Sequence, residues 1–484
     1  MAKTYYTFRI RLANDELVRV EKWDEQHQSK GEPSRPFRYK EKLEQITSLL
    51  QPILSDELNS SKQARALGEV LFDAVFDDVL RQEFVNCYQE AVRDKKQLLR
   101  IELDIDEQTM PEVAALPWEF MCLPASANLG DRWLGTDPNL VFSRRRALWH
   151  PAPPIQLEKG EKLRIALAIA APKDLGTVKY EEVQEALESL AKEQAEQIEL
   201  LPIVNPATPR AIDALLEQQP HIFHFIGHGQ LQNEEGEEVG QIALMKKVFN
   251  TALWMDAGSF SELFNRWSPG VVLLQACESG MLSASKAFAS AASKIVQMNI
   301  PVVVAMQYEV SNITASQFAY EFYERLAKGE PVDIAAQNGR RTIGLETQHR
   351  KRDFATPVIS MRVQDGYLFK RQEAEAESGK QNDRAIAKDN AQNIHIVDQH
   401  QDVNQRGKYN TNAGPGSTVH QYHGVGVEPK ADMASSKSSQ QPTAKDNTQI
   451  IQNVQQSGEE SLNFERASNF RIGDDFYQSG SPQK

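Results

Sequence analysis

Two apolar stretches, residues 221–229 (HIFHFIGHG) and 271–280 (VVLLQACESG), decide how the fold of this chain is predicted. Each is rich in large apolar side chains and ends in a segment that contains glycine. Continuous apolar runs of this kind are typical of strands in a parallel sheet, because both faces of such a sheet are covered. The carboxyl ends of parallel strands meet at one edge, so we expect His228 and Cys277 to be neighbours there.

Similar short strands alternate with helices over residues 155–372. The predicted strands are residues 163–170, 198–204, 221–226, 271–276, 301–306, 356–363 and 367–369, and the predicted helices are residues 180–194, 209–217, 281–296, 315–328 and 332–345. Strands that alternate with helices predict an α/β fold, an αβα sandwich with a mostly parallel sheet. The edge that carries His228 and Cys277 is then the expected place for chemistry.

Residues 1–150 are expected to form an N-terminal α+β region. Its predicted strands are residues 5–13, 97–105 and 140–142, and its predicted helices lie within residues 39–54 and 64–94. The charged sequence from residue 14 to about residue 40 is given no regular structure. Prolines at positions 151, 153 and 154 indicate a linker to the second region.

The last part of the chain, residues 373–484, differs in composition from the rest. Its only leucine is Leu462, and all six tryptophans precede residue 268. Such a segment cannot bury enough apolar surface to offset the entropy of ordering, so a disordered tail is predicted. Asn, Gln, Gly and β-branched residues concentrate at 393–427, which we interpret as a self-assembly motif. The alternative is a solvated linker with no role.

Overall composition excludes several functional classes. The 484 residues carry 54 basic and 67 acidic side chains, a net charge of -13, which argues against direct nucleic-acid binding. Three cysteines are too few for a disulfide scaffold or a zinc site. No signal-peptide pattern and no apolar run of about 20 residues is found, which predicts a cytoplasmic protein without a membrane span. No metal or other cofactor is expected.

A thiol and an imidazole within bonding reach are sufficient for nucleophilic acyl transfer. The imidazole of His228 would accept the proton of Cys277, because the thiolate is the reactive form of cysteine. The backbone N–H groups of Gly229 and Cys277 would stabilise the oxyanion that develops on the substrate. The glycines beside His228 allow a substrate to approach the backbone closely.

The other histidines and cysteines have simpler interpretations. His224 lies on the predicted strand and is expected to be a satisfied core histidine. Cys87 and Cys122 are expected to be buried and inert. The His224–His228 spacing places two rings on one face of a strand but roughly 13 Å apart, which argues against a metal site.

Several separated blocks resemble one family in the same order. The segments HFIGHG (224–229), LLQACESG (273–280), 300–343 and DFATPVISMR (353–362), with LPWE (116–119) upstream, are similar to the CHAT family of caspase-like cysteine peptidases, relatives of caspases, separase and gingipains. The resemblance covers roughly residues 60–370. It implies a caspase-like fold, with His228 as the catalytic histidine and Cys277 as the nucleophile. Trp118 and Glu119 are expected to hold the N-terminal region against the catalytic sheet.

The family also implies a protein substrate and activation by a partner or by assembly through the tail. By family analogy alone, the pathway would be bacterial defence or regulated cell death. Members often carry Asp where Asn312 stands, near the expected specificity pocket, so a weaker preference for Lys or Arg is predicted. Glu262, Asp256 or Glu309 can compensate, because residues 231–265, taken as loops, carry many carboxylates.

Two other functions are compatible with the sequence. One is a catalytically idle caspase-like scaffold that recruits partners through its tail. The other is an acyltransferase or a hydrolase of a non-peptide substrate that uses the same dyad. The presence of both His228 and Cys277 at strand ends favours the endopeptidase, since an idle scaffold does not need both groups.

Overall fold

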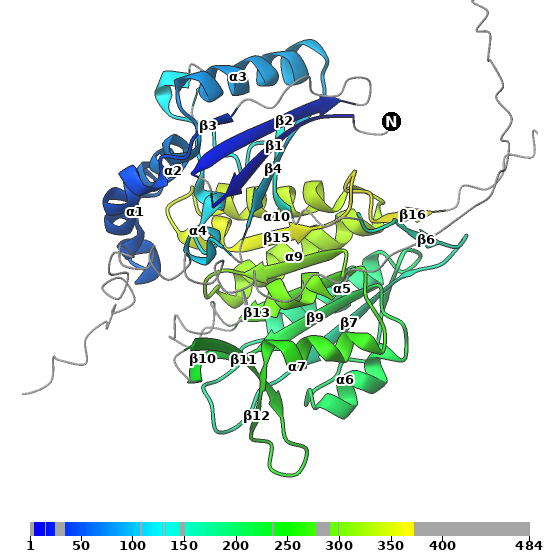
Figure 1. The fold of residues 1–484 in the computed structure, drawn as a ribbon. Coiled ribbons are helices and arrows are strands. Elements are labelled where there is room, and N and C mark those ends of the chain that lie inside the picture. The colour runs from blue at the N-terminus through cyan, green and yellow to red at the C-terminus, as the bar shows by residue number, and fades with distance from the viewer. Residues whose placement is uncertain are drawn as a thin grey trace, which may run out of the picture. The chain divides into compact units, whose positions relative to one another are not determined.

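The computed structural model describes residues 4–14, 16–24, 34–106, 109–127, 129–130, 132–145, 151–234, 237–276, 291–298 and 300–371 (Figure 1). Cys277, most of the predicted helix 281–296 and the tail from residue 373 therefore lie outside the described residues. Residues 291–297, the end of that helix, are helical.

A large, mostly parallel sheet forms the centre of the fold (Figure 1). Its described strands follow the order β3-β2-β1-β4-β5-β15-β14-β13-β9-β7-β8. Only the β1–β2, β2–β3 and β14–β15 pairs of this described sheet are antiparallel. The strands are β1 (Tyr5–Ala13), β2 (Leu17–Asp24), β3 (Ser34–Pro36), β4 (Leu98–Ile105), β5 (Leu140–Arg145), β7 (Leu163–Ile169), β8 (Ile198–Leu200), β9 (Ile222–Gly227), β13 (Val271–Ala276), β14 (Val302–Met306) and β15 (Pro357–Met361).

Helices cover both faces of this sheet, and the predicted α/β class is confirmed. Along β9, Ile222 and Ile226 belong to a core shared with α5, α9 and α10, whereas Phe223 and Phe225 belong to a core shared with α6 and α7. This alternation buries both sides of an uninterrupted apolar strand. The helices are α1 (Tyr39–Leu54), α2 (Ser61–Val75), α3 (Asp78–Tyr88), α4 (Pro111–Ala114), α5 (Glu181–Glu193), α6 (Pro209–Leu216), α7 (Ala257–Glu262), α9 (Asn312–Ala327) and α10 (Val332–Glu346).

Two predictions of irregular structure are wrong. Residues 17–24 and 34–36 form β2 and β3, and the residues of β2 that alternate with its charged side chains, Val18 and Val20, are fully buried. Residues 231–265 are not mainly loops, because β10 (Gly229–Glu234), β11 (Glu237–Met245) and β12 (Ala252–Asp256) form a separate antiparallel sheet. In both places a polar face masked the alternating pattern of the strands.

The predicted helix over residues 64–94 is divided. Helix α2 ends at Val75, and Asp77 then caps α3, since its carboxylate accepts a hydrogen bond of 2.9 Å from the N–H of Leu80. A π-helical turn, η1 (Gln89–Asp94), follows α3. A carboxylate at an N-cap starts a new helix because it satisfies one of the N–H groups that lack a helical partner.

The N-terminal region and the region that contains His228 contribute neighbouring strands to one sheet. The parallel pair of β5 and β15 joins them, with Arg144 beside Ser360. The division at residues 150–155 stays a prediction. A short parallel pair, β6 (Ile155–Leu157) with β16 (Phe369–Arg371), lies apart from the large sheet. Within the described part of the chain, no helix is both long enough and apolar enough to cross a membrane.

Of Trp118 and Glu119, Glu119 has the predicted role of holding the N-terminal region against the central sheet. They lie in a 3-10 turn, η2 (Trp118–Phe120), where the indole N–H of Trp118 donates to the carbonyl of Val113 at 2.8 Å. The Glu119 carboxylate is buried and accepts hydrogen bonds of 2.9 and 2.6 Å from Arg144. The same guanidinium donates to Oε1 of Gln307, which directly follows β14, at 3.0 Å. This chain of contacts ties the N-terminal region to the central strands.

Candidate active site

The register of β9 and β13 brings the two predicted catalytic positions to the same edge of the sheet. These strands are parallel neighbours, and their ladder ends with Gly227 beside Ala276. His228 and Cys277 are the next residues along the two strands. The backbone therefore leads to both positions at the carboxyl edge, although Cys277 itself lies outside the described residues.

His228 is held by a backbone carbonyl. Its side chain is 4% exposed, and its Nε2 atom lies 2.8 Å from the carbonyl oxygen of Gly176. A carbonyl oxygen can only accept a hydrogen bond, so Nε2 carries the hydrogen, and Nδ1 of the neutral ring is an acceptor. Gly176 belongs to residues 170–180, which connect β7 to α5. Nδ1 therefore carries no hydrogen and can accept a proton, as a general base must.

The N–H of Gly229 points away from β11. The carbonyl of His228 accepts a hydrogen bond of 3.0 Å from the N–H of Ala243. Successive residues of an antiparallel strand direct their backbone groups to opposite sides of the strand. Gly229, which lies opposite Ile242, is therefore at a position where the two residues do not hydrogen-bond to each other. Its N–H is thus directed toward the open side of β10, beside His228.

His224 is a core residue, as predicted. It is fully buried, with Nε2 3.1 Å from Oε1 of Gln275 and Nδ1 3.1 Å from the hydroxyl of Tyr323. Burial lowers the pKa of His224 to about 4, so the ring is neutral at physiological pH. Among the residues that the structure describes, no group of three or more His, Cys, Asp or Glu side chains could hold a metal ion.

Asn312 is the first residue of α9 and is 9% exposed. Its side-chain N–H donates to the carboxylate of Glu182, in the first turn of α5, whereas its Oδ1 atom has no hydrogen-bond partner. Sequence reasoning missed Glu182, because 130 residues separate it from Asn312. Helices α5 and α9 begin after β7 and β14, so both residues lie toward the carboxyl edge of the sheet. The neutral residue at position 312 thus has a carboxylate beside it.

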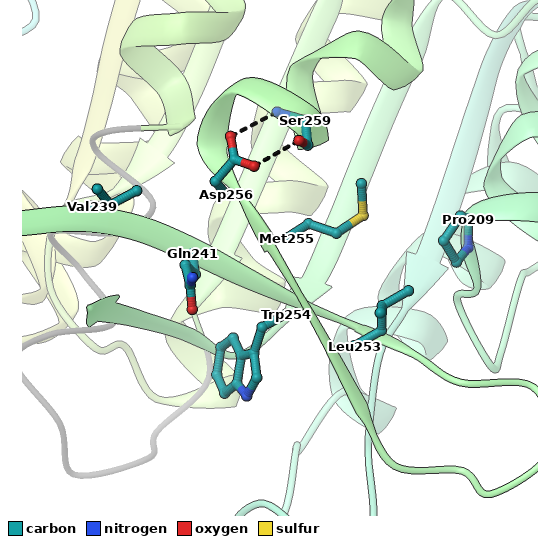
Figure 2. Close-up of a pocket in the computed structure, with 8 residues that line it drawn as sticks. All are labelled: Pro209, Val239, Gln241, Leu253, Trp254, Met255, Asp256 and Ser259. Carbon is teal, nitrogen blue, oxygen red and sulfur yellow. Dashed lines mark hydrogen bonds between the residues drawn. The ribbon is translucent and has the colours of Figure 1, made fainter. Parts of the chain in front are cut away.

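Of the three carboxylates that were expected to compensate for Asn312, Asp256 has other partners. Asp256 caps α7, since it accepts hydrogen bonds from the N–H and hydroxyl of Ser259 at 2.9 and 2.6 Å (Figure 2). Glu262 is the last residue of α7. Glu309 lies between β14 and α9, and its backbone carbonyl accepts from Arg352 at 3.4 Å. By position in the chain, Glu309 is the nearest of the three to Asn312.

The remaining cysteines are buried, as predicted. Cys87 lies in α3 and is 4% exposed, and burial raises the pKa of its thiol to about 11. Cys122 is fully buried. Thiols of this kind are poor nucleophiles, because little thiolate forms near neutral pH.

A pocket of about 520 Å³ lies on β11 and β12 (Figure 2). A second pocket, of about 510 Å³, lies between α5 and β8. Neither is lined by His228. The residues that line the first are Pro209, Val239, Gln241, Leu253, Trp254, Met255, Asp256 and Ser259.

His228 is thus a buried histidine at the carboxyl edge of a mostly parallel sheet, beside a strand that leads to a cysteine. A family model described as "CHAT domain" matches residues 65–359. The chain therefore belongs to the CHAT domain family, and the family predicted from the sequence is confirmed. A search of curated proteins finds no match.

The solved structures that are similar to the chain include two of RgpB. The complex of the pro- and mature domains of RgpB from Porphyromonas gingivalis is 13% identical, covering 69% of this chain and 78% of that chain with a TM-score of 0.36. The crystal structure of the Arg-specific cysteine proteinase gingipain R (RGPB) is 12% identical, covering 68% of this chain and 76% of that chain with a TM-score of 0.35.

Proposed function

We propose that the protein is a cysteine endopeptidase whose catalytic dyad is His228 and Cys277. The observation that carries this proposal is the hydrogen bond between His228 Nε2 and the Gly176 carbonyl. It leaves Nδ1 as an acceptor at the end of β9, next to the strand that leads to Cys277. Both ring nitrogens of the core histidine His224 bond to described side chains, whereas among the described residues only Nε2 of His228 has a partner.

The reaction follows from these groups. Nδ1 of His228 accepts the thiol proton, and the Cys277 thiolate attacks the carbonyl carbon of the scissile bond, so that an S–C bond forms. The N–H groups of Gly229 and Cys277 donate to the oxyanion. The imidazolium then protonates the leaving amine as the C–N bond breaks. Water, deprotonated by the same imidazole, hydrolyses the thioester and releases the second product.

The substrate is proposed to be a polypeptide, with Asn312 and Glu182 near the side chain that precedes the scissile bond. The unpartnered Oδ1 of Asn312 and the adjacent Glu182 carboxylate are both hydrogen-bond acceptors. Two acceptors suit a side chain that only donates, such as Lys or Arg. Glu182 would thus supply the negative charge that Asn312 lacks, which amends the expectation drawn from position 312 alone. Activation by assembly through residues 393–427, a cytoplasmic location and a role in defence stay predictions.

The proposal is tested by profiling new protein N-termini in cells that express matched amounts of each variant. We expect wild type and Cys87→Ala to produce the same new N-termini. Cys277→Ala and His228→Ala should produce none above background, because loss of a catalytic group costs several powers of ten in rate. Identical cleavage by Cys277→Ala would contradict the peptidase. No cleavage by any variant, with partners still captured by Cys277→Ala, would favour the idle scaffold.

A further inference from the structure

The segment that holds His228 is itself fastened to the three-stranded sheet. In addition to the bond from the N–H of Ala170 to the carbonyl of Ile226 at 2.9 Å, three hydrogen bonds connect residues 173–176 of this segment to their surroundings. The N–H of Lys173 donates to the carbonyl of Asn250 at 2.9 Å, and Oδ1 of Asp174 accepts from the N–H of Ala252 at 2.8 Å. The carbonyl of Gly176 accepts from His228 at 2.8 Å. Of these three, only the bond of Asp174 uses a side chain of the segment.

The N–H of Ala252 is available to Asp174 because of its place in the ladder. The N–H of Lys246 donates to the carbonyl of Thr251 at 2.8 Å, and Ala252 pairs with Met245 one step further along. The alternation of an antiparallel ladder directs the Ala252 N–H outward, away from β11. Among the described strands β12 is an edge of its sheet, so this N–H needs a partner outside the ladder. The carboxylate of Asp174 is that partner.

Asp174 and Gly176 are close in the chain, so an anchor at one restricts the other. Two residues span at most about 7 Å, and a fixed Asp174 therefore confines the Gly176 carbonyl to a small volume. Gly176 is exposed and carries no side chain that could fix it otherwise. Without the anchor, this carbonyl can move away from Nε2, and the ring of His228 can then rotate or change tautomer.

We propose that Asp174 is a positioning residue for His228. Its carboxylate fastens the segment to the edge of β12, so that the Gly176 carbonyl keeps Nδ1 of His228 free of hydrogen and directed toward the nucleophile. This inference rests on the proposed function, in which His228 and Cys277 form a dyad. In this role Asp174 acts through the Gly176 carbonyl and not through a contact of its own with the imidazole.

The test measures how fast iodoacetamide alkylates Cys277 as a function of pH, in the full chain. Mass spectrometry of the peptide that contains Cys277 separates this reaction from those of Cys87 and Cys122. A histidine that accepts the thiol proton increases the thiolate fraction below the ordinary thiol pKa of about 8.5. We expect wild type to react at pH 6.5 faster than His228→Ala by about tenfold or more.

The variants at position 174 separate the anchor from the charge. Asp174→Ala loses the acceptor and should lower the rate at pH 6.5 by about three- to tenfold, toward the rate of His228→Ala. Asp174→Asn keeps an oxygen that accepts from Ala252 and should retain the wild-type profile. Lys173→Ala is the matched control, because its exposed side chain is removed while its backbone bond to Asn250 stays. Melting temperatures are recorded for every variant, and those at the exposed position 174 should stay within a few degrees of wild type.

The outcomes distinguish the two proposals. If His228→Ala has the wild-type profile, the dyad is wrong. If His228→Ala shifts the profile but Asp174→Ala does not, the dyad stands and the positioning role is overturned. If Asp174→Asn is as slow as Asp174→Ala, the charge of the carboxylate and not its hydrogen bond to Ala252 sets the rate, which also overturns the anchor.

Discussion

Replacing Arg100 by Met should destabilise the fold strongly, because Arg100 and Asp333 form a buried ion pair between β4 and α10. The Nε–Oδ2 distance is 2.7 Å, and the two side chains are 3% and 0% exposed. The guanidinium also donates to the carbonyl of Asp365 at 2.8 Å and stacks on the ring of Tyr5 at 3.8 Å. Removing it leaves the Asp333 carboxylate charged and unpaired in the interior.

The magnitude follows from that uncompensated charge. Breaking a buried pair by removing one partner costs about 3–5 kcal/mol, whereas replacing both partners by apolar residues is often near neutral. We therefore expect Arg100→Met to lower the free energy of unfolding by about 3–5 kcal/mol. The double variant Arg100→Met/Asp333→Leu should recover most of this loss.

Urea unfolding, followed by tryptophan fluorescence, measures these differences. The matched control is Arg266→Met, which breaks an ion pair with Asp213 whose side chains are 48% and 45% exposed. It should cost less than about 1 kcal/mol. A loss below about 1 kcal/mol for Arg100→Met would refute the reasoning. A double variant less stable than Arg100→Met would show that the pair is not the source of the effect.

Three further predictions concern pH, specificity and the tail. Burial lowers the pKa of three histidines to about 4, namely His221, His224 and His349. These histidines are protonated near pH 6.5 in the unfolded chain but only near pH 4 in the folded chain, so the free energy of unfolding should be highest above pH 6.5 and fall toward pH 4. The fall should be shallower in His224→Gln, and urea midpoints that rise on acidification would contradict the prediction. Glu182→Gln should reduce cleavage after Lys and Arg in a positional peptide library by about ten- to a hundredfold, whereas a library profile unchanged by this substitution would exclude Glu182 from the pocket. Truncation after Arg371 should leave the melting temperature unchanged but reduce cleavage in cells until an unrelated oligomerising domain is fused, and full activity without the tail would exclude the assembly role.

The sequence predicts best those elements whose apolar residues follow one clear pattern. Strands β9 and β13 are continuous apolar runs because helices cover both of their faces. Strand β2 was missed because its charged residues pair across the sheet. Glu21 bonds Arg9 of β1 at 3.0 Å, and Arg9 bonds Glu102 of β4 at 2.8 Å. A charged face of this kind looks like a loop until the partner strands are known.

The parts of the site that could not be predicted depend on contacts between distant segments. Nothing in the local sequence around Gly176 indicates that its carbonyl faces His228, 52 residues later. The pairing of Glu182 with Asn312 is equally non-local. The periodicity of the sequence predicts the strands, and the topology of a parallel sheet then places the candidate residues at the ends of those strands. The loops that orient those candidates have no periodicity, and their contacts follow only from the folded chain.

The N-terminal region is connected to the candidate site through the central sheet. Arg144 on β5 is held by the buried Glu119 and donates to Gln307, the first residue after β14. The segment from Gln307 leads directly to Ser311, which caps α9 by accepting from the N–H of Thr314 at 3.2 Å, and to Asn312. One end of this short segment is therefore fixed by the N-terminal region, and the other begins the helix that carries the proposed specificity residue. A displacement of β5 would act on Asn312 through the contact of Arg144 with Gln307. His228 is instead held by the carbonyl of Gly176. Asn312, the proposed specificity residue, is thus connected to the N-terminal strands through Gln307, whereas the segment after β7 holds His228 and leads into α5, whose Glu182 also contacts Asn312.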